Sequence, residues 1–134
     1  MIYVLDSSAM IALANDETGA DVVDSLLADP QNECYAHAIN LCEVFYDAIR
    51  RSNEAQAVNL ISDLRNLGVV ENRDFDPAFW QQAGRLKATH RRVSLADRCA
   101  LTLTMRLGGE LLTSDHHELD VLAATGTYPI KVFR

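Results

Sequence analysis

The sequence predicts an α/β domain in which a mostly parallel sheet is flanked by helices. Short apolar runs, typical of buried strands, alternate along the chain with longer stretches of helical periodicity. The 134 residues are 49% apolar and 23% charged, which is too apolar for a disordered chain. No linker, repeat or low-complexity segment divides them, so we expect one domain over residues 1–134.

The first half of the chain is predicted to hold two strands and four helices. Ile2–Leu5 is a short apolar run that ends at Asp6, and Ser7 and Ser8 then offer N-caps for a helix. The other elements expected in this half are a helix from about 18 to 30, a strand over 33–36, and helices over 38–51 and 54–67.

The second half continues the alternation. Val69 and Val70 predict a short third strand, and Asp76 followed by Pro77 is the signature of an N-cap with proline at the first helical position. The remaining expected elements are helices to about residue 91 and over 94–107, a strand over 110–113, a short helix over 116–124 and a last strand over 130–133.

The net charge of −7 and the sequence pI near 4.9 argue at first against a nucleic-acid partner, since phosphate-binding proteins usually carry a basic excess. The charge is, however, unevenly distributed. Residues 1–67 hold eleven acids and three arginines, a net −8, whereas residues 68–134 hold eight acids and nine lysines or arginines, a net +1. The acid excess therefore belongs to the first half of the chain.

The cysteines and the amino-terminal residues indicate the compartment. Three cysteines without a Cys-x-x-Cys pair favour reduced thiols over a disulfide framework. The sequence starts without the basic stretch of a signal peptide, and no apolar run approaches the roughly 20 residues that span a bilayer. We therefore expect a cytoplasmic protein that does not associate with membranes.

Two acidic residues follow predicted strands. Asp6 closes the strand Ile2–Leu5, and Asp115 follows the strand Glu110–Thr113. In an open parallel sheet, binding sites form beyond the carboxyl ends of the strands. Taken alone, each residue is better explained as a helix N-cap or a turn aspartate. The functional interpretation is favoured if both stand at adjacent strand ends of one sheet.

Asp97 lies three residues after Ser94 at the start of a predicted helix. This spacing is that of a capping box, in which the acid bonds back to the cap. On a helical wheel, however, Asp97 lies off the polar stripe formed by Arg98, Thr102 and Arg106. A carboxylate away from solvent needs a partner, and a cation is one such partner.

Glu43 lies at the margin of the apolar side predicted for the helix over 38–51. Without the other acids, a solvated boundary glutamate or an ion pair with Arg50 is the preferred explanation. The residues of that apolar side are Ile39, Cys42, Phe45, Tyr46 and Ile49.

Four carboxylates at one edge of a sheet repel one another unless a cation neutralises them. Oxygen-only ligands select a hard cation, Mg²⁺ or Mn²⁺. Such a cation can orient and deprotonate a water and stabilise charge on a phosphodiester. A set of acids that holds a metal ion is therefore compatible with a polyanionic substrate, despite the negative net charge.

These acids stand in motifs that resemble a known family. In its pattern, a first strand ends in Asp-x-Ser, a mid-chain helix carries a Glu, a helix starts with Ser-x-x-Asp, and Thr-x-Asp follows a strand. The sequence has these features, in this order, as Leu5-Asp6-Ser7-Ser8-Ala9, Asn40-Leu41-Cys42-Glu43-Val44, Ser94-Leu95-Ala96-Asp97 and Leu112-Thr113-Ser114-Asp115. Over essentially the whole chain, it resembles the PIN domain family, and specifically the VapC-like toxins of bacterial and archaeal toxin–antitoxin pairs.

The resemblance implies a Rossmann-like sheet and a metal-dependent endoribonuclease that hydrolyses RNA phosphodiester bonds. It also implies a homodimer that a cognate antitoxin protein inhibits. Ser8 and Thr113 match small polar residues that support the site, and Glu118 is a candidate for a fifth acid. The residues that the resemblance assigns to catalysis and to binding Mg²⁺ or Mn²⁺ are Asp6, Glu43, Asp97 and Asp115.

Basic residues that could contact RNA gather before the Asp97 helix. Arg91 and Arg92 end the run over 87–92, although a solvated helix end explains this run equally well. Cys42 and Cys99 are expected to be small buried hydrophobes. The aromatic residues expected in the core or in a dimer contact, rather than stacked on bases, are Phe75, Phe79 and Trp80.

Two other classes of function stay open. A phosphoryl-transfer enzyme or receiver-like domain also places Asp at strand ends, but a phosphatase of this kind has Asp-x-Asp where Ser8 stands. A non-catalytic interaction module would use the four acids only as caps. The sequence motifs of serine hydrolases, P-loop proteins, dinucleotide-binding proteins and zinc sites are absent.

Overall fold

The fold is that of a computed structural model, which describes residues 1–116 and 119–134. Its sheet has the strand order β3-β2-β1-β4-β5, and every neighbouring pair of strands is parallel. The predicted α/β fold with a parallel sheet is confirmed. The strands are β1 (Ile2–Leu5), β2 (Glu33–His37), β3 (Val69–Asn72), β4 (Glu110–Thr113) and β5 (Ile130–Val132).

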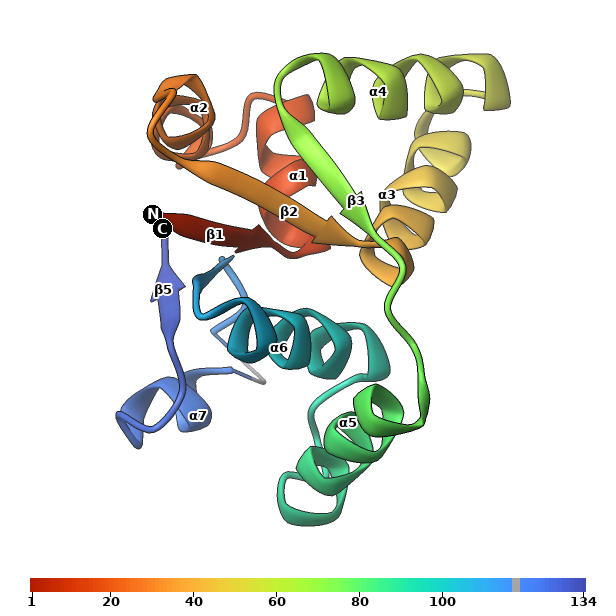
Figure 1. The fold of residues 1–134 in the computed structure, drawn as a ribbon. Helices are drawn as coiled ribbons and strands as arrows, with labels where there is room; N and C mark the ends of the chain where they lie inside the picture. Colours follow the sequence, from red (N-terminus) through yellow and green to blue (C-terminus); the bar gives the residue numbers. More distant parts are fainter. Residues whose placement is uncertain (117–118) are drawn as a thin grey trace.

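Helices cover both faces of this sheet (Figure 1). On one side lie α1 (Ser7–Ala14), α2 (Ala20–Ala28), α3 (Ala38–Arg51) and α4 (Glu54–Asn66). On the other side lie α5 (Pro77–Thr89), α6 (Leu95–Leu107) and α7 (Asp120–Ala124). None of the described helices has the length and apolar character needed to cross a bilayer.

Successive residues of β1 face opposite sides of the sheet, as the period of two in a strand requires. Tyr3 and Leu5 pack into the core under α1 to α4, and Val4 packs into the core that α5 and α6 cover. Because both faces are covered, the central strand β1 is apolar along its whole length rather than alternating.

The strand order places a topological switch point between β1 and β4. The chain builds outwards from β1 through β2 to β3 and then returns to add β4 on the other side of β1. The helix that follows β1, α1, lies on one face of the sheet, and the helix next in sequence after β4, α7, lies on the other (Figure 1). Ligand sites in open α/β sheets form at such a point, beyond the carboxyl ends of the strands.

The predicted start of α1 and the predicted length of α7 were wrong. The N-cap of α1 is Asp6 rather than Ser7 or Ser8, because its side chain accepts a hydrogen bond from the backbone N–H of Ala9, which confirms the alternative interpretation of Asp6 as a helix N-cap. The helix expected over 116–124 is shorter, at Asp120–Ala124, and residues 117–118 of that prediction lie outside the described part of the chain.

The predicted buried side of α3 was also wrong. Leu41, Val44 and Asn40 are buried, whereas Cys42 and Tyr46 are exposed. The apolar stripe of this helix is wider than the face that α1, α4 and the sheet cover, so packing decides which part of it reaches solvent.

The polar stripe predicted for α6 fails at Thr102, which is fully buried. This helix contacts three strands as well as α3 and α5, so little of its surface is left for solvent. Asp97 is buried, as its place off the polar stripe predicts, and Cys99 is buried as expected.

Candidate active site

Asp6 forms the centre of the candidate site, directly after β1. It is 1% exposed, and its Oδ1 accepts hydrogen bonds from the Ser8 hydroxyl (2.6 Å) and the Ala9 backbone N–H (3.0 Å). Burial raises the pKa of Asp6 to about 6, although hydrogen bonds from Ser8, Thr113 and Ala9 act in the opposite direction. Burial therefore disfavours the charged form of the Asp6 carboxylate, and a nearby cation would stabilise that form.

Asp115 stands across the switch point from Asp6. The Ser8 hydroxyl oxygen accepts a hydrogen bond from the backbone N–H of Ser114 at 2.9 Å, which ties the first turn of α1 to the segment after β4. Thr113 contacts both carboxylate-bearing residues. Its hydroxyl oxygen accepts a hydrogen bond from the backbone N–H of Asp115 (2.9 Å), and its side chain also hydrogen-bonds Asp6. The negative charge of Asp115 contributes to the raised pKa of Asp6, so the two carboxylates interact.

Glu43 joins this site through Ser7. The Ser7 hydroxyl donates a 2.8 Å hydrogen bond to Oε1 of Glu43, which lies half-buried in α3. Sequence reasoning considered Ser7 only as a helix cap and missed this contact. The only sequence signal for a role of Ser7 in the site was its position next to Asp6. The hydrogen bond from Ser7 to Glu43 depends on how α1 packs against α3.

Asp97 lies in the first turn of α6, where it is 8% exposed. Its backbone N–H donates to the hydroxyl of the N-cap Ser94 at 3.2 Å, which is one half of the predicted capping box. The preceding residue, Ala96, accepts a 3.3 Å hydrogen bond from the side-chain amide of Asn40 in α3. Sequence reasoning missed Asn40, which links the helix of Asp97 to the helix of Glu43.

Three helices begin at this edge of the sheet. The amino ends of α1 and α3 follow the carboxyl ends of β1 and β2 directly, and α6 runs back towards the start of β4 (Figure 1). The partial positive charge of a helix amino terminus stabilises negative groups within about one turn. The fold therefore offsets part of the repulsion between the acids at this edge.

The four acids share this edge without forming the close cluster that the sequence predicts. Across residues 1–116 and 119–134, no three histidine, cysteine, aspartate or glutamate side chains are arranged so that they could hold a metal ion. The donor chemistry nevertheless fits Mg²⁺ or Mn²⁺, because every candidate ligand is a carboxylate oxygen and Asp6 is a buried one.

The other predicted residues lie outside this hydrogen-bonded group. Arg91 and Arg92 are exposed in the turn between α5 and α6, shortly before Ser94. His116, to which the sequence assigns no role, is exposed, and its Nδ1 lies 3.2 Å from a carboxylate oxygen of Asp120, an ion pair when the imidazole is protonated. The candidate fifth acid, at position 118, lies outside the described residues.

The aromatic residues after β3 divide between core and surface. Phe79 is fully buried and stacks on His37 with ring centroids 5.1 Å apart, whereas Phe75 and Trp80 are about half exposed. The expectation of a core position therefore holds for Phe79 alone.

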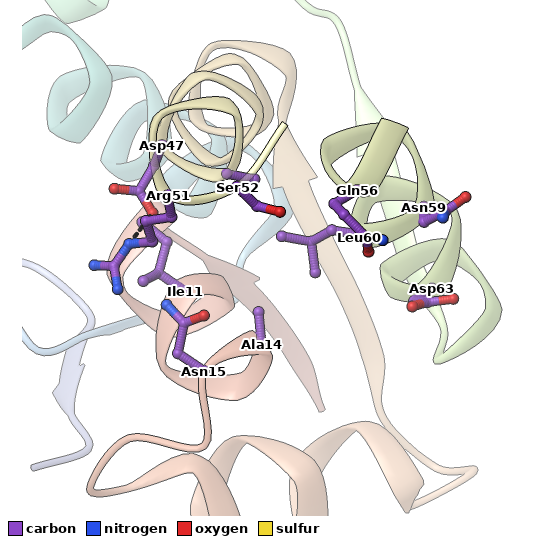
Figure 2. A pocket seen from close by; sticks show the side chains of 11 residues that line it. Ile11, Ala14, Asn15, Asp47, Arg51, Ser52, Gln56, Asn59, Leu60 and Asp63 are labelled. Atoms are coloured by element: carbon purple, nitrogen blue, oxygen red, sulfur yellow. Dashed lines mark ion pairs between the residues drawn. The ribbon is translucent and has the colours of Figure 1, made fainter. Parts of the chain in front are cut away.

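A separate groove lies between α1, α3 and α4 (Figure 2). It has a volume of about 270 Å³ and contains none of the four candidate carboxylates. Ile11 of α1 and Leu60 of α4 point into it, and Asp47 forms an ion pair with Arg51 (2.9 Å) on its α3 side. All of its lining residues fall within the acidic half of the chain.

Solved structures with similar folds are toxin–antitoxin proteins. VapBC-1 from nontypeable Haemophilus influenzae is 20% identical, with a TM-score of 0.73 over 99% of this chain and 98% of that chain. VapBC2 from Rickettsia felis, bound to a DNA fragment from its promoter, is 14% identical, with a TM-score of 0.75 over 100% of both chains. VapC20 from Mycobacterium tuberculosis, a sarcin-ricin loop cleaving toxin, is 17% identical, with a TM-score of 0.73 over 96% of both chains.

At these identities, the structural similarity shows a shared fold. In a comparison with curated proteins, no sequence matched this chain. The family model of the PIN domain matches residues 3–124, which cover all four sequence motifs and every strand except β5. The chain therefore belongs to the PIN domain family.

Proposed function

We propose that the chain is a Mg²⁺- or Mn²⁺-dependent endoribonuclease that acts in the cytoplasm as the toxin of a toxin–antitoxin pair. The observation that carries this proposal is the buried Asp6 carboxylate, whose pKa is raised to about 6, with Asp115 across the switch point. A buried carboxylate is held at a cost that a cation offsets. Membership of the PIN family and the fold shared with a sarcin-ricin loop cleaving toxin support the same conclusion.

Each acid has a role in this proposal. Asp6, Asp97 and Asp115 would ligate the cation, and Glu43 would either ligate it or orient a water. When bound, the cation supplies a Lewis acid that lowers the pKa of water and stabilises charge on the phosphodiester. Ser8 and Thr113 hold the Asp6 carboxylate in place through their hydrogen bonds.

We assign RNA contact to the turn between α5 and α6. Arg91 and Arg92 are exposed there, and the same turn leads into the first turn of α6 with Asp97. Contacts from arginine to phosphates weaken steeply as the salt concentration rises. Replacing both arginines with alanine should raise KM for RNA and reduce its salt dependence, whereas kcat should stay near the wild-type value.

The nuclease proposal is tested with Asp6→Asn beside the wild type. The wild-type protein should bind Mn²⁺ in a calorimetric titration and cleave RNA with Mg²⁺ but not with EDTA. Asp6→Asn should fold and lose both properties. Full cleavage by Asp6→Asn would refute the assignment, and a wild-type protein that neither binds Mn²⁺ nor cleaves RNA would favour an interaction module without turnover.

We propose that the partner is an antitoxin with a basic segment, which docks in the groove between α1, α3 and α4. The lining of the groove carries Asp47 and Asp63 against Arg51, a net −1, and Asp47 already pairs with Arg51, so Asp63 is the lining charge offered to a basic partner. A protein of this fold from Klebsiella pneumoniae was solved as a toxin–antitoxin complex. Co-expression of the neighbouring open reading frame should relieve growth arrest, and Asp63→Lys in the groove should weaken that relief. A neighbouring protein with an acidic carboxyl-terminal tail would count against this docking mode.

A homodimer is proposed through the exposed aromatic residues after β3. Trp80 is 46% exposed and Phe75 is 47% exposed, and neither contributes to the two cores. Large exposed apolar side chains of this kind are frequent in protein interfaces. Light scattering should give a dimer for the wild type and a monomer for Trp80→Glu, and a dimer in both would exclude this surface.

A further inference from the structure

We propose that Asn40 is a positioning residue for the candidate site. Its amide group fixes the first turn of α6, which carries Asp97, relative to α3, which carries Glu43. The inference rests on the proposed function, because it concerns how two of the same carboxylates are held.

The contact geometry supports this role. Asn40 is fully buried, and its Nδ2 donates a 3.3 Å hydrogen bond to the carbonyl oxygen of Ala96, 56 positions away. Ala96 directly precedes Asp97. Glu43 follows Asn40 by three positions, a spacing that places two side chains beside each other on a helix surface. The Asn40 side chain therefore connects the backbone next to Asp97 with the turn of α3 that precedes Glu43.

The amide oxygen of Asn40 supplies a second observation. This buried Oδ1 atom has no hydrogen-bond partner among the residues that the structure describes. A buried polar atom without a partner lowers the free energy of unfolding, so an apolar side chain of similar size at position 40 would give a protein at least as stable. The contribution specific to asparagine is the bond between α3 and α6, and hence the relative placement of Glu43 and Asp97.

A matched control occurs in the same helix as Asp97. Thr102 is also fully buried, and its hydroxyl oxygen is the other unpartnered buried side-chain atom found within the described residues. It belongs to α6 but makes no side-chain hydrogen bond to α3. Replacing Thr102 with valine therefore removes an unpartnered buried oxygen while leaving the bond between the two helices intact.

The experiment compares Asn40→Leu and Thr102→Val with the wild type. Mn²⁺ affinity is measured by calorimetric titration, the free energy of unfolding in urea with EDTA, and kcat and KM on one RNA transcript that the wild type cleaves. Loss of a residue that orients metal ligands typically lowers metal affinity or activity by about 10- to 100-fold. We expect Asn40→Leu to lower Mn²⁺ affinity and kcat by this factor, with KM for RNA and the free energy of unfolding nearly unchanged. Thr102→Val should keep the wild-type Mn²⁺ affinity and kcat.

Unchanged Mn²⁺ affinity and kcat in Asn40→Leu, beside a wild type that binds Mn²⁺ and cleaves RNA, would overturn the role of Asn40 alone. An equal loss in Thr102→Val would also overturn it, since any change in the α6 core would then have the same effect. If Asn40→Leu does not fold, Asn40→Ser decides by the same criterion, because its shorter side chain cannot span the 3.3 Å bond to Ala96. A wild type without Mn²⁺ binding or RNA cleavage contradicts the proposed function itself, and the role of Asn40 with it.

Discussion

The Ser7 hydroxyl donates a 2.8 Å hydrogen bond to Oε1 of Glu43, a residue 36 positions further along the chain. Ser7 is the first residue of α1 and directly follows Asp6, the N-cap of the same helix. One helix start therefore holds two of the candidate carboxylates. Asp6 is held by the cap hydrogen bond and by Ser8, and Glu43 is held by Ser7 across the contact between α1 and α3.

Replacing Ser7 with alanine should lower kcat for RNA cleavage by about tenfold, because Glu43 then loses the group that orients it. The free energy of unfolding should change by no more than about 1 kcal/mol, since the bond is only partly buried. Ser7→Thr keeps a hydroxyl at this position and should retain most of the activity. Equal losses in Ser7→Ala and Ser7→Thr would show that the hydrogen bond is not the cause.

The fold could be predicted from the sequence because its elements carry local signals. The apolar run of β1, the Asp76-Pro77 start of α5 and the glycines after α6 each determine an element without reference to the rest of the chain. The buried side of α3 could not be predicted in this way. Its apolar residues exceed the area that its neighbours cover, so only the packed structure shows that Tyr46 faces solvent.

The positions of Asp6, Asp97 and Asp115 were predictable from strand ends and a helix start, whereas their hydrogen-bond partners and the contact of Glu43 were not. Asp6 and Asp115 follow strands that pair directly, so the parallel sheet brings their loops together. The contacts of Ser7 and Asn40 connect residues 36 and 56 positions apart, and they depend on the placement of α3 between α1 and α6. No local pattern in a single sequence carries that information.

Asp6→Asn should stabilise the metal-free protein above pH 6. The pKa of Asp6 rises from 3.8 to about 6 on folding, chiefly because the carboxyl group is buried. The folded state therefore binds the proton more tightly than the unfolded state, and stability falls as the pH rises from about 4 to about 6. A shift of this size corresponds to about 3 kcal/mol. The amide oxygen of asparagine can accept the two bonds that Asp6 Oδ1 receives from Ser8 and Ala9, without a charge, so the variant should recover a large part of this free energy at pH 7.5.

Urea unfolding with EDTA at pH 4 and pH 7.5 measures this effect, and Asp76→Asn provides a matched control. Asp76 is likewise an N-cap, of α5, but it is exposed and forms an ion pair with Arg106 at 3.2 Å. Its replacement should lower the free energy of unfolding by less than about 1 kcal/mol at pH 7.5. Asp6→Asn that is no more stable than the wild type at pH 7.5 would show that the buried charge is not destabilising.

Two glycines should respond in opposite directions to alanine. A Cβ atom on Gly109 would stand 2.6 Å from the carbonyl oxygen of Ile2, so β4 would have to move away from β1. At Gly84, inside α5, the corresponding position meets no atom within 4 Å in the described part of the chain, apart from the adjacent residues and the backbone of its own helix. We expect Gly84→Ala to raise the free energy of unfolding by about 1 kcal/mol, as helix propensity predicts. Gly109→Ala should lower it, by about 1–3 kcal/mol for a steric clash in a packed interior.

Because β1 and β4 carry Asp6 and Asp115 at their ends, Gly109→Ala should also weaken Mn²⁺ binding, whereas Gly84→Ala should not. Urea unfolding and Mn²⁺ titration of the two variants test both statements. Intact Mn²⁺ affinity in a destabilised Gly109→Ala protein would show that the spacing of β1 and β4 does not control the site.

The affinity for Mn²⁺ should depend on pH in a way that Asp6 determines. A carboxyl group must lose its proton before it can ligate a cation, so protons and Mn²⁺ compete at this residue. With the pKa of Asp6 at about 6, the association constant should fall about tenfold for each pH unit below that value and level off above it. Titrations between pH 5 and pH 8 at constant ionic strength measure the profile. An ordinary aspartate, with a pKa near 3.9, would give a flat profile over this range. A flat profile would therefore mean either that Asp6 is not a ligand or that its burial does not govern its protonation.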